Sequence, residues 1–233
     1  MAVDLYVGTL TRYYTRQWEN VVQKMAREQG LKYQLVTPNQ GDKDAITDPA
    51  VVEPAMQVWQ QNVSDALTQA GGDRTSWKEG VDAPYFTDRI GWNPLLALNL
   101  WASHVEMGTT PPSKVSPDMI ADEAYSECLA NPDKHQIPVF LSAQFWLPAN
   151  FIFHAKFPSP TGEETNVASL DGLIFALEKL NEQSWKTIDW RSWLKNDFDD
   201  RSNLESNAQF GFAALANMAA EAKKNQLPMI LSF

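Results

Sequence analysis

The sequence has a single cysteine among its 233 residues, so no disulfide can form within the chain. Disulfides are common in secreted domains, whereas cytosolic thiols stay reduced. The first residues, 1–4, lack the apolar run of a signal peptide. The most apolar helix-length run, 95–102, is far shorter than the roughly 18 residues that span a bilayer. We therefore expect a cytoplasmic protein without a membrane segment.

Basic residues are also scarce. The chain has 19 lysines and arginines against 29 aspartates and glutamates, a formal net charge of −10. Because nucleic acids and anionic membranes are bound through lysine and arginine, this charge argues against both as partners. An acidic protein attracts a basic partner over long range. Many proteins are acidic for solubility alone, so both interpretations stay open.

Motifs that bind nucleotides or metals are missing. The segment 8–14, which follows the first predicted strand, has one glycine, too few for a dinucleotide or P-loop fingerprint. Neither H-E-x-x-H nor G-x-S-x-G occurs. Cys128 lies on the apolar line of a predicted helix, which favours a buried, inert thiol. We therefore expect no metal and no cofactor, and no motif names a family.

Strand and helix patterns follow one another irregularly. Residues 3–10 predict a strand, Thr15 is a plausible cap of a helix that ends before Gly30, and residues 31–36 predict a second strand. A strand, a helix and a strand joined by short connections predict a right-handed βαβ unit. The helix that begins at Asn93 is apolar on nearly every side, as is typical of a central helix. A further helix starts at Asp48-Pro49 or at Glu53-Pro54 and ends at residue 70. Helices are also expected over 116–131, from the cap Ser169 to residue 181, and over 208–225. The last segment, 227–233, predicts a strand, and the stretches 73–91 and 159–166 predict irregular connections.

Residues 137–158 predict a β-hairpin, because this stretch is rich in aromatic and β-branched residues. Pro148 and Asn150 suit a three-residue turn. With Leu147 opposite Phe151, the odd positions of both strands form one apolar face. The opposite, mostly polar face carries Ser142, Gln144, His154 and Lys156.

The order of these elements indicates the fold class. No repeat, low-complexity tract or long linker divides the chain, so we predict one globular domain over 1–233. Its strands and helices neither alternate strictly nor segregate. We predict an α+β fold with a mixed sheet of about five strands, the average size, and several helices packed on it. A three-layer α/β arrangement is the alternative.

His154 is the residue best suited to acid/base chemistry in the predicted hairpin. It lies across from Gln144, with Ser142 and Lys156 on the same face, and histidine titrates near neutrality. These four residues are the candidate catalytic set of a small-molecule enzyme. The plainer interpretation is a solvated sheet surface with a cross-strand Gln–His pair.

The segment after residue 182 is rich in tryptophan and is followed by acidic residues. Aromatic anchors surrounded by charge are typical of protein-binding hot spots. The alternative is that Ile188, Trp190, Trp193 and Leu194 cover the core between two helices. The acidic run lacks the spacing of a calcium loop. The candidate partner-binding residues are Trp185, Trp190, Trp193, Asp197, Asp199 and Asp200.

Two classes of function therefore stay open. The first is a small acidic protein-binding module, for example a bacterial immunity or antitoxin-like protein that neutralises a basic partner. The second is a small-molecule enzyme with His154 as acid and base. Self-assembly into a homo-oligomer is a further possibility.

Overall fold

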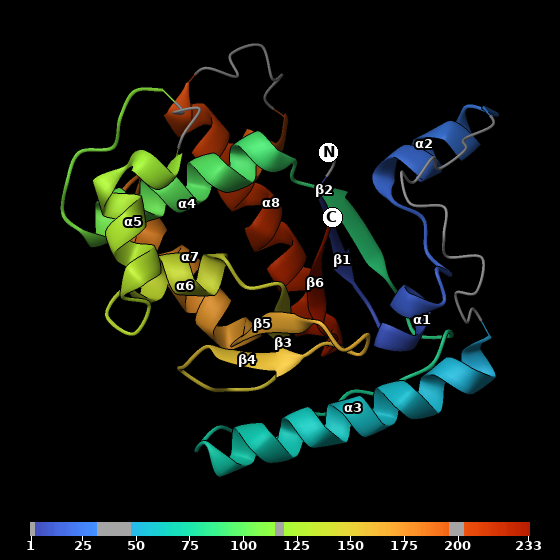
Figure 1. The fold of residues 1–233 in the computed structure, drawn as a ribbon. Coiled ribbons are helices and arrows are strands. Elements are labelled where there is room, and N and C mark those ends of the chain that lie inside the picture. Colours follow the sequence, from blue (N-terminus) through green and yellow to red (C-terminus); the bar gives the residue numbers. More distant parts are fainter. Residues whose placement is uncertain (1–2, 32–47, 115–118, 196–202) are drawn as a thin grey trace.

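The computed structural model describes residues 3–31, 48–114, 119–195 and 203–233. They form one mixed sheet with helices packed on it (Figure 1). The strands are β1 (Asp4–Val7), β2 (Phe86–Arg89), β3 (Phe145–Leu147), β4 (Ala155–Pro158), β5 (Glu164–Ser169) and β6 (Met229–Ser232). The helices are α1 (Leu10–Tyr14), α2 (Val21–Glu28), α3 (Pro49–Gln69), α4 (Trp92–Glu106), α5 (Glu123–Ala130), α6 (Gln136–Leu141), α7 (Leu170–Gln183) and α8 (Leu204–Asn225), with short 3-10 helices η1 (Met119–Ala121) and η2 (Trp190–Lys195).

The six strands have the order β2-β1-β6-β3-β5-β4. β3 and β5 run parallel, and the other neighbouring pairs are antiparallel. The α+β prediction with a mixed sheet is therefore confirmed, with six strands in place of about five. The predicted final strand is confirmed as β6, which lies inside the sheet between β1 and β3.

The sheet separates two groups of helices. On one face, α7 and α8 contact the strands, and α4 packs on α8. Trp146 points to this side and donates its indole N–H to the carbonyl of Phe140, 2.7 Å away. Its neighbour Phe145 points to the other face, where its ring lies 5.9 Å from that of Trp59 on α3. Because successive strand residues face opposite sides, both faces of the sheet are buried at β3.

The crossing of α4 and α8 forms the centre of the helical layer. Leu98 and Leu215 are fully buried there. A Cβ atom at Gly211 would lie 2.5 Å from the carbonyl oxygen of Pro94, so the two backbones approach closely only because this residue is glycine. The prediction that the helix near Asn93 is central and buried is confirmed.

A buried carboxylate fixes the turn between β1 and α1. Glu79, only 6% exposed, accepts hydrogen bonds from the backbone N–H groups of Leu10 and Thr11, at 3.3 and 2.9 Å. It also accepts from the Thr11 hydroxyl at 2.8 Å and from the Trp77 indole. Because each of these donors meets the carboxylate, the buried charge is compensated. The segment before β2 is thereby fastened to the exit of β1.

The predicted hairpin over 137–158 is wrong. Its first part is helix α6, with Pro138 in the first turn, where proline is tolerated. Ile137, Phe140 and Leu141 are buried at helical spacing. The later strands β3 and β4 do not pair with each other, because β5 lies between them. A short apolar run fits a helix and a strand equally well, and only its partners decide between them.

Several helix boundaries follow from caps. Thr15 closes α1 and does not open a helix, because Asn20 caps α2 through reciprocal hydrogen bonds with Gln23. Asp48 caps α3 as predicted, and the helix runs on through Pro54, so the alternative start at Glu53 is wrong. Ser169 caps α7 as predicted.

Other predictions shift or fall outside the described residues. The stretches 73–91 and 159–166, predicted as irregular, contribute β2 and part of β5. α8 begins at Leu204, before the predicted residue 208, because Asn203 caps it. Residues 32–36 of the predicted second strand, on which the predicted βαβ unit depends, lie outside the described residues. Among the described helices, none combines the length and apolarity needed to cross a bilayer.

Candidate functional site

The three tryptophans predicted to bind a partner gather around one ring, Phe212 of α8. The ring centroids of Trp185, Trp190 and Trp193 lie 5.5, 6.3 and 5.8 Å from that of Phe212, all nearly perpendicular to it. Edge-to-face contacts of this kind are favourable. Phe212 is buried, and the tryptophans are partly buried. The structure therefore brings the predicted aromatic residues together, over the edge of the core.

Hydrogen bonds fix the orientation of the innermost indole rings. Trp101 of α4 stacks on Trp185 with centroids 5.6 Å apart, and its indole N–H donates to the Ser184 hydroxyl at 3.0 Å. The Trp185 indole N–H donates to the Glu205 carboxylate at 3.1 Å. Partly buried indoles usually find such partners. The cluster is therefore preorganised by contacts from three different helices.

The loop after α7 is held by the Asn181 side chain. Its amide donates to the carbonyl of Thr187 at 2.8 Å and accepts from the N–H of Thr187 at 3.2 Å. Lys186 adopts a left-handed conformation with φ 53°. The next residue after this clamp, Ile188, is 98% exposed. Ile188 therefore does not cover the core, whereas Trp190, Trp193 and Leu194 pack against it, so the core-covering interpretation holds for these three residues only. No sequence pattern distinguishes an exposed isoleucine here from a buried one.

The charged residues along this loop are of both signs. The Arg191 guanidinium lies 4.3 Å from the ring centroid of Trp190, as in a cation–π contact. The surface is therefore aromatic and mixed in charge. The exposed charged residues over 182–195 are Glu182, Lys186, Asp189, Arg191 and Lys195.

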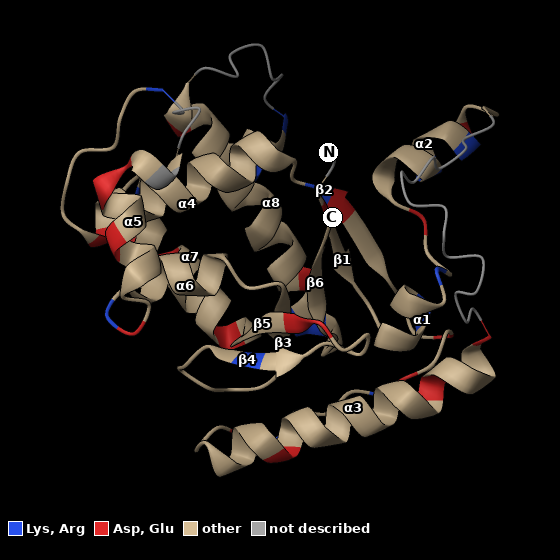
Figure 2. Cartoon of the chain, in the orientation of Figure 1, with Lys and Arg blue, Asp and Glu red and all other residues tan. Residues whose placement is uncertain are grey.

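The predicted acidic part of the site, Asp197, Asp199 and Asp200, lies outside the described residues. In the described part of the chain, acidic residues are spread over several helices, strands and connections (Figure 2). The net negative charge is therefore a property of the whole molecule and does not mark one described patch.

Three of the four predicted catalytic residues line one hollow, although the hairpin does not form. Ser142, His154 and Lys156 border a space of about 170 Å³ between α5, α6 and the β4 edge of the sheet. Gln144 is absent from its wall, because its side-chain oxygen accepts from the Thr165 hydroxyl at 2.6 Å. The topology thus brings these three residues together by a route that differs from the predicted one.

This hollow lacks an oriented acid/base pair. Lys156 is paired with Glu164 at 2.9 Å, and both side chains are exposed. No described residue forms a hydrogen bond with the His154 ring. A catalytic histidine is normally held in one tautomer by a partner on its second nitrogen. The arrangement therefore supplies a cavity with polar groups, without the partner that general base catalysis calls for.

Cys128 and His104 have structural surroundings. Cys128 is buried, and burial raises the pKa of its thiol, which keeps it protonated and unreactive. His104 bridges the Thr109 hydroxyl at 2.8 Å and the Asp122 carboxylate at 3.1 Å, which ties the end of α4 to the start of α5. Among the described residues, no group of three or more His, Cys, Asp or Glu side chains is arranged to hold a metal ion.

The comparisons with known proteins give no relative. No family model, no curated protein and no solved structure matches the chain. A function is therefore inferred only from the residues of this chain. A second hollow, between Glu106 and Lys179, is not predicted by any sequence pattern, because its residues come from three helices far apart along the chain.

Proposed function

We propose that the chain is a protein-binding module that docks its partner on the tryptophan surface, formed by Trp185, Ile188, Trp190 and Trp193. The observation that carries this proposal is the 98% exposure of Ile188 beside three partly buried tryptophans. Single exposed apolar residues are common. Burying an isoleucine, however, is worth about 1.5–3 kcal/mol, and tryptophan is enriched in binding hot spots.

The rigidity of this surface supports the proposal. Immobilising a side chain on binding costs about 0.5–1.5 kcal/mol. Trp185 is already held by Phe212, Trp101 and Glu205 before any partner arrives. The loop that presents Ile188 is fastened through Asn181. A partner therefore meets an ordered apolar anchor, and little of its binding energy is lost to ordering.

The charge of the chain suggests a basic partner. With a net charge of −10, the chain attracts a cationic protein over long range and speeds its association. The charges along the loop after α7 are mixed in sign. We therefore expect the apolar contacts to determine the stability of the complex with the partner, and the net charge of the chain to determine how fast that complex forms. A bacterial immunity or antitoxin-like protein that neutralises a basic partner is the concrete form of this proposal.

Affinity capture with matched baits tests the proposal. The baits are the native chain, Ile188→Asp and the control Ile152→Asp, used on a lysate of the source organism. Ile152 is 80% exposed in the connection between β3 and β4, so both substitutions add one charge at a solvent-exposed isoleucine. Neither is expected to alter folding, unlike alanine at Trp190 or Trp193, which would also remove core packing.

We expect a basic protein to be captured by the native chain and by Ile152→Asp, and to be lost with Ile188→Asp. Its association rate should fall as salt is added, with a smaller change in its dissociation rate. The proposal is rejected if all three baits capture the same proteins, because no captured protein would then depend on Ile188. Circular dichroism of each bait verifies that folding is retained.

The second candidate is a small-molecule enzyme at the hollow near β4, favoured because Ser142, His154 and Lys156 all line it. His154 would act as acid and base, and Lys156 would orient an anionic substrate. A panel of small carboxylates, followed by NMR of the histidine rings, tests this. A ligand must shift the His154 ring signals and leave those of His104 unchanged. If no carboxylate does so, this candidate is rejected.

A further inference from the structure

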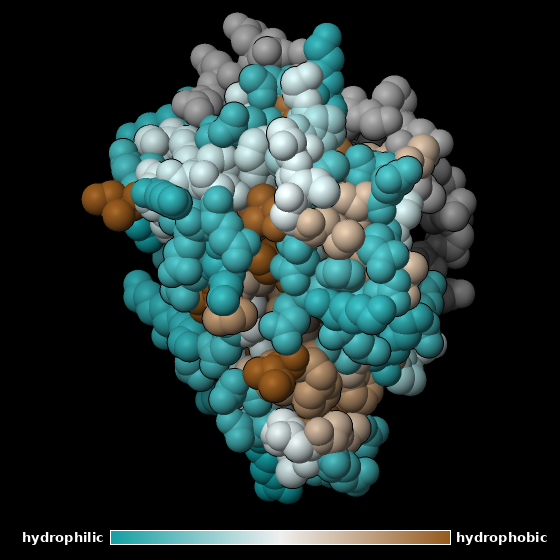
Figure 3. All heavy atoms as spheres, turned by 90° about the vertical axis from the view of Figure 1, so that its left-hand side faces the viewer, coloured by the Kyte–Doolittle hydropathy of each residue, from teal (hydrophilic) through white to brown (hydrophobic). Residues whose placement is uncertain are grey.

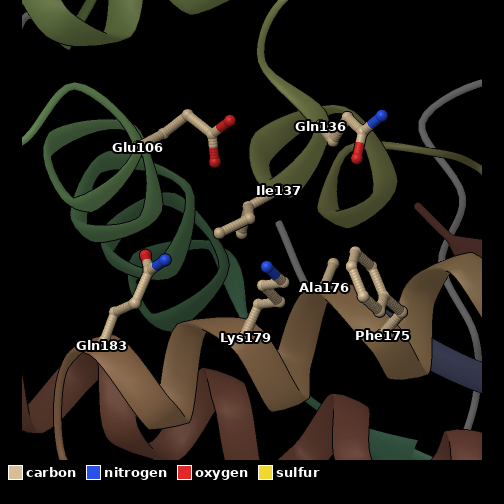
Figure 4. Close-up of a pocket in the computed structure, with 7 residues that line it drawn as sticks. All are labelled: Glu106, Gln136, Ile137, Phe175, Ala176, Lys179 and Gln183. Carbon is tan, nitrogen blue, oxygen red and sulfur yellow. The ribbon is translucent and has the colours of Figure 1, made fainter.

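A second hollow lies between three helices and shares no residue with the tryptophan surface. It has a volume of about 140 Å³. Its floor is apolar, because Ile137 and Ala176 are buried. Its walls are polar and come from the end of α4, the start of α6 and one face of α7 (Figure 4). The side chains that line these walls are Glu106, Gln136, Phe175, Lys179 and Gln183.

Two opposite charges face this space without being paired. Glu106 and Lys179 point into it from opposite sides (Figure 4). Among the residues that the structure describes, neither of them forms an ion pair. The Lys179 ammonium lies 5.4 Å from the ring centroid of Phe175, a cation–π contact between two exposed side chains. A carboxylate and an ammonium are therefore held apart by a gap.

The spacing of residues on α7 explains one wall. Phe175, Lys179 and Gln183 follow one another at intervals of four, so they lie on the same face of the helix. Gln136 at the start of α6 and Gln183 add amide donors and acceptors at the rim. The site can thus pair with a positive group, a negative group and uncharged polar atoms at the same time.

Size and surface restrict the class of ligand. Pockets for drug-sized molecules measure about 300–1,000 Å³. This hollow is therefore too small for a nucleotide, or for several side chains of a protein partner inserted together. The elements that line it lie toward the left of Figure 1. That face is mostly hydrophilic, with small separate hydrophobic areas (Figure 3). A small polar molecule fits it better than a protein surface does.

We propose that this hollow binds a free α-amino acid with an uncharged side chain, with its ammonium group on Glu106 and its carboxylate on Lys179. A ligand with one charge could pair with only one of the two groups, either the half-buried Glu106 carboxylate or the exposed Lys179 ammonium. A zwitterion satisfies both. The apolar floor at Ile137 and the Phe175 ring receive its side chain. This site is separate from the tryptophan surface and does not depend on the function proposed there.

NMR titration of the whole chain tests the proposal. The probes are uncharged L-amino acids, beginning with L-alanine, together with L-alaninamide, which lacks the carboxylate, and N-acetyl-L-alanine, which lacks the ammonium group. We expect the backbone amides of Glu106 and Lys179 and the side-chain amides of Gln136 and Gln183 to shift with an amino acid. Each blocked derivative should bind about tenfold more weakly, as loss of one charge-assisted hydrogen bond predicts.

Single substitutions distinguish specific binding in this hollow from nonspecific attraction by the charges of the protein. Lys179→Met and Glu106→Gln should each weaken binding about tenfold. Lys78→Met and Glu28→Gln remove the same charges from exposed positions elsewhere and should leave binding unchanged. The proposal is overturned if no uncharged amino acid shifts these amides, if the blocked derivatives bind as well as the zwitterion, or if the control variants weaken binding as much as the site variants.

Discussion

The Trp185 indole meets the Phe212 ring edge to face, with centroids 5.5 Å apart and ring planes at 74°. This contact joins the loop after α7 to the long helix α8. Trp193 approaches the same ring from another side, at 5.8 Å. Phe212 is therefore the buried residue on which the tryptophans of the proposed binding surface pack.

Replacing Phe212 with alanine should lower the free energy of unfolding by about 3–5 kcal/mol, as for other buried aromatic residues. The ring is 3% exposed, so the substitution leaves a cavity under the tryptophans. Urea unfolding followed by tryptophan fluorescence measures the change. Ile188→Ala on the same surface should alter stability by no more than about 0.5 kcal/mol. Equal effects of the two substitutions would contradict this description of the cluster.

Glu79→Gln should destabilise the protein even though the shape of the side chain is kept. The amide NH₂ would take the place of one carboxylate oxygen. It would then face either the Leu10 N–H and the Trp77 indole, or the N–H and hydroxyl of Thr11. Each donor left without an acceptor costs about 1–3 kcal/mol. Urea unfolding of Glu79→Gln beside Glu28→Gln, an exposed control, measures the effect. A Glu79 variant as stable as the control would show that the carboxylate is dispensable.

Asp122 should make the protein more stable at neutral pH than in acid. Burial alone would raise its pKa, but hydrogen bonds from the Tyr125 N–H and from His104 outweigh burial and lower it. Its contribution is therefore present above the unfolded-state pKa of about 3.9 and is lost as pH falls through the lower folded-state value. Asp122→Asn, which can still cap α5, should be less stable than the native chain at pH 7. Thermal unfolding from neutral pH into acid should show this difference shrinking.

Asp88 should behave in the opposite way and serves as the comparison. Burial raises its pKa, and the hydrogen bond from the Arg89 N–H compensates only in part. The contribution of the Asp88 carboxyl group to the free energy of unfolding is therefore fully present below its unfolded-state pKa. This contribution is lost as pH rises through the raised folded-state pKa. Asp88→Asn should be more stable than the native chain at pH 7 and equal to it in acid. The same slope for both variants would contradict the two assignments.

Gly211→Ala should destabilise the protein, although alanine favours a helix over glycine by about 1 kcal/mol. The added Cβ would lie 2.5 Å from the Pro94 carbonyl oxygen, which belongs to the backbone of α4 and cannot rotate away. The two helices must then move apart. Ser206→Ala, at an exposed position in the first turn of α8, should be nearly neutral and is the control. Calorimetry measures both, and a stabilised Gly211 variant would contradict the close crossing.

The local signals in the sequence were reliable where a structure depends on neighbouring residues. The sequence predicts Ser169 as a cap and Asp48 as one of two possible caps, because a cap accepts hydrogen bonds from residues two or three positions on. The apolar run after Asn93 predicted the buried α4, and the final apolar segment predicted β6. In each of these, the information lies within a few residues of the element itself.

Only the tertiary structure decided which strands pair and which side chains meet. The run over 137–158 suits a hairpin locally, but β5 inserts between β3 and β4 because pairing depends on segments distant in the chain. Contacts made elsewhere in the fold likewise decide that Ile188 is exposed while the tryptophans beside it pack on Phe212. The sequence alone determined α4, the Ser169 cap and the charge, since these are local or additive properties, but it did not determine α6 or the role of Thr15. The candidate sites belong to the fold, since they arise where distant segments come together.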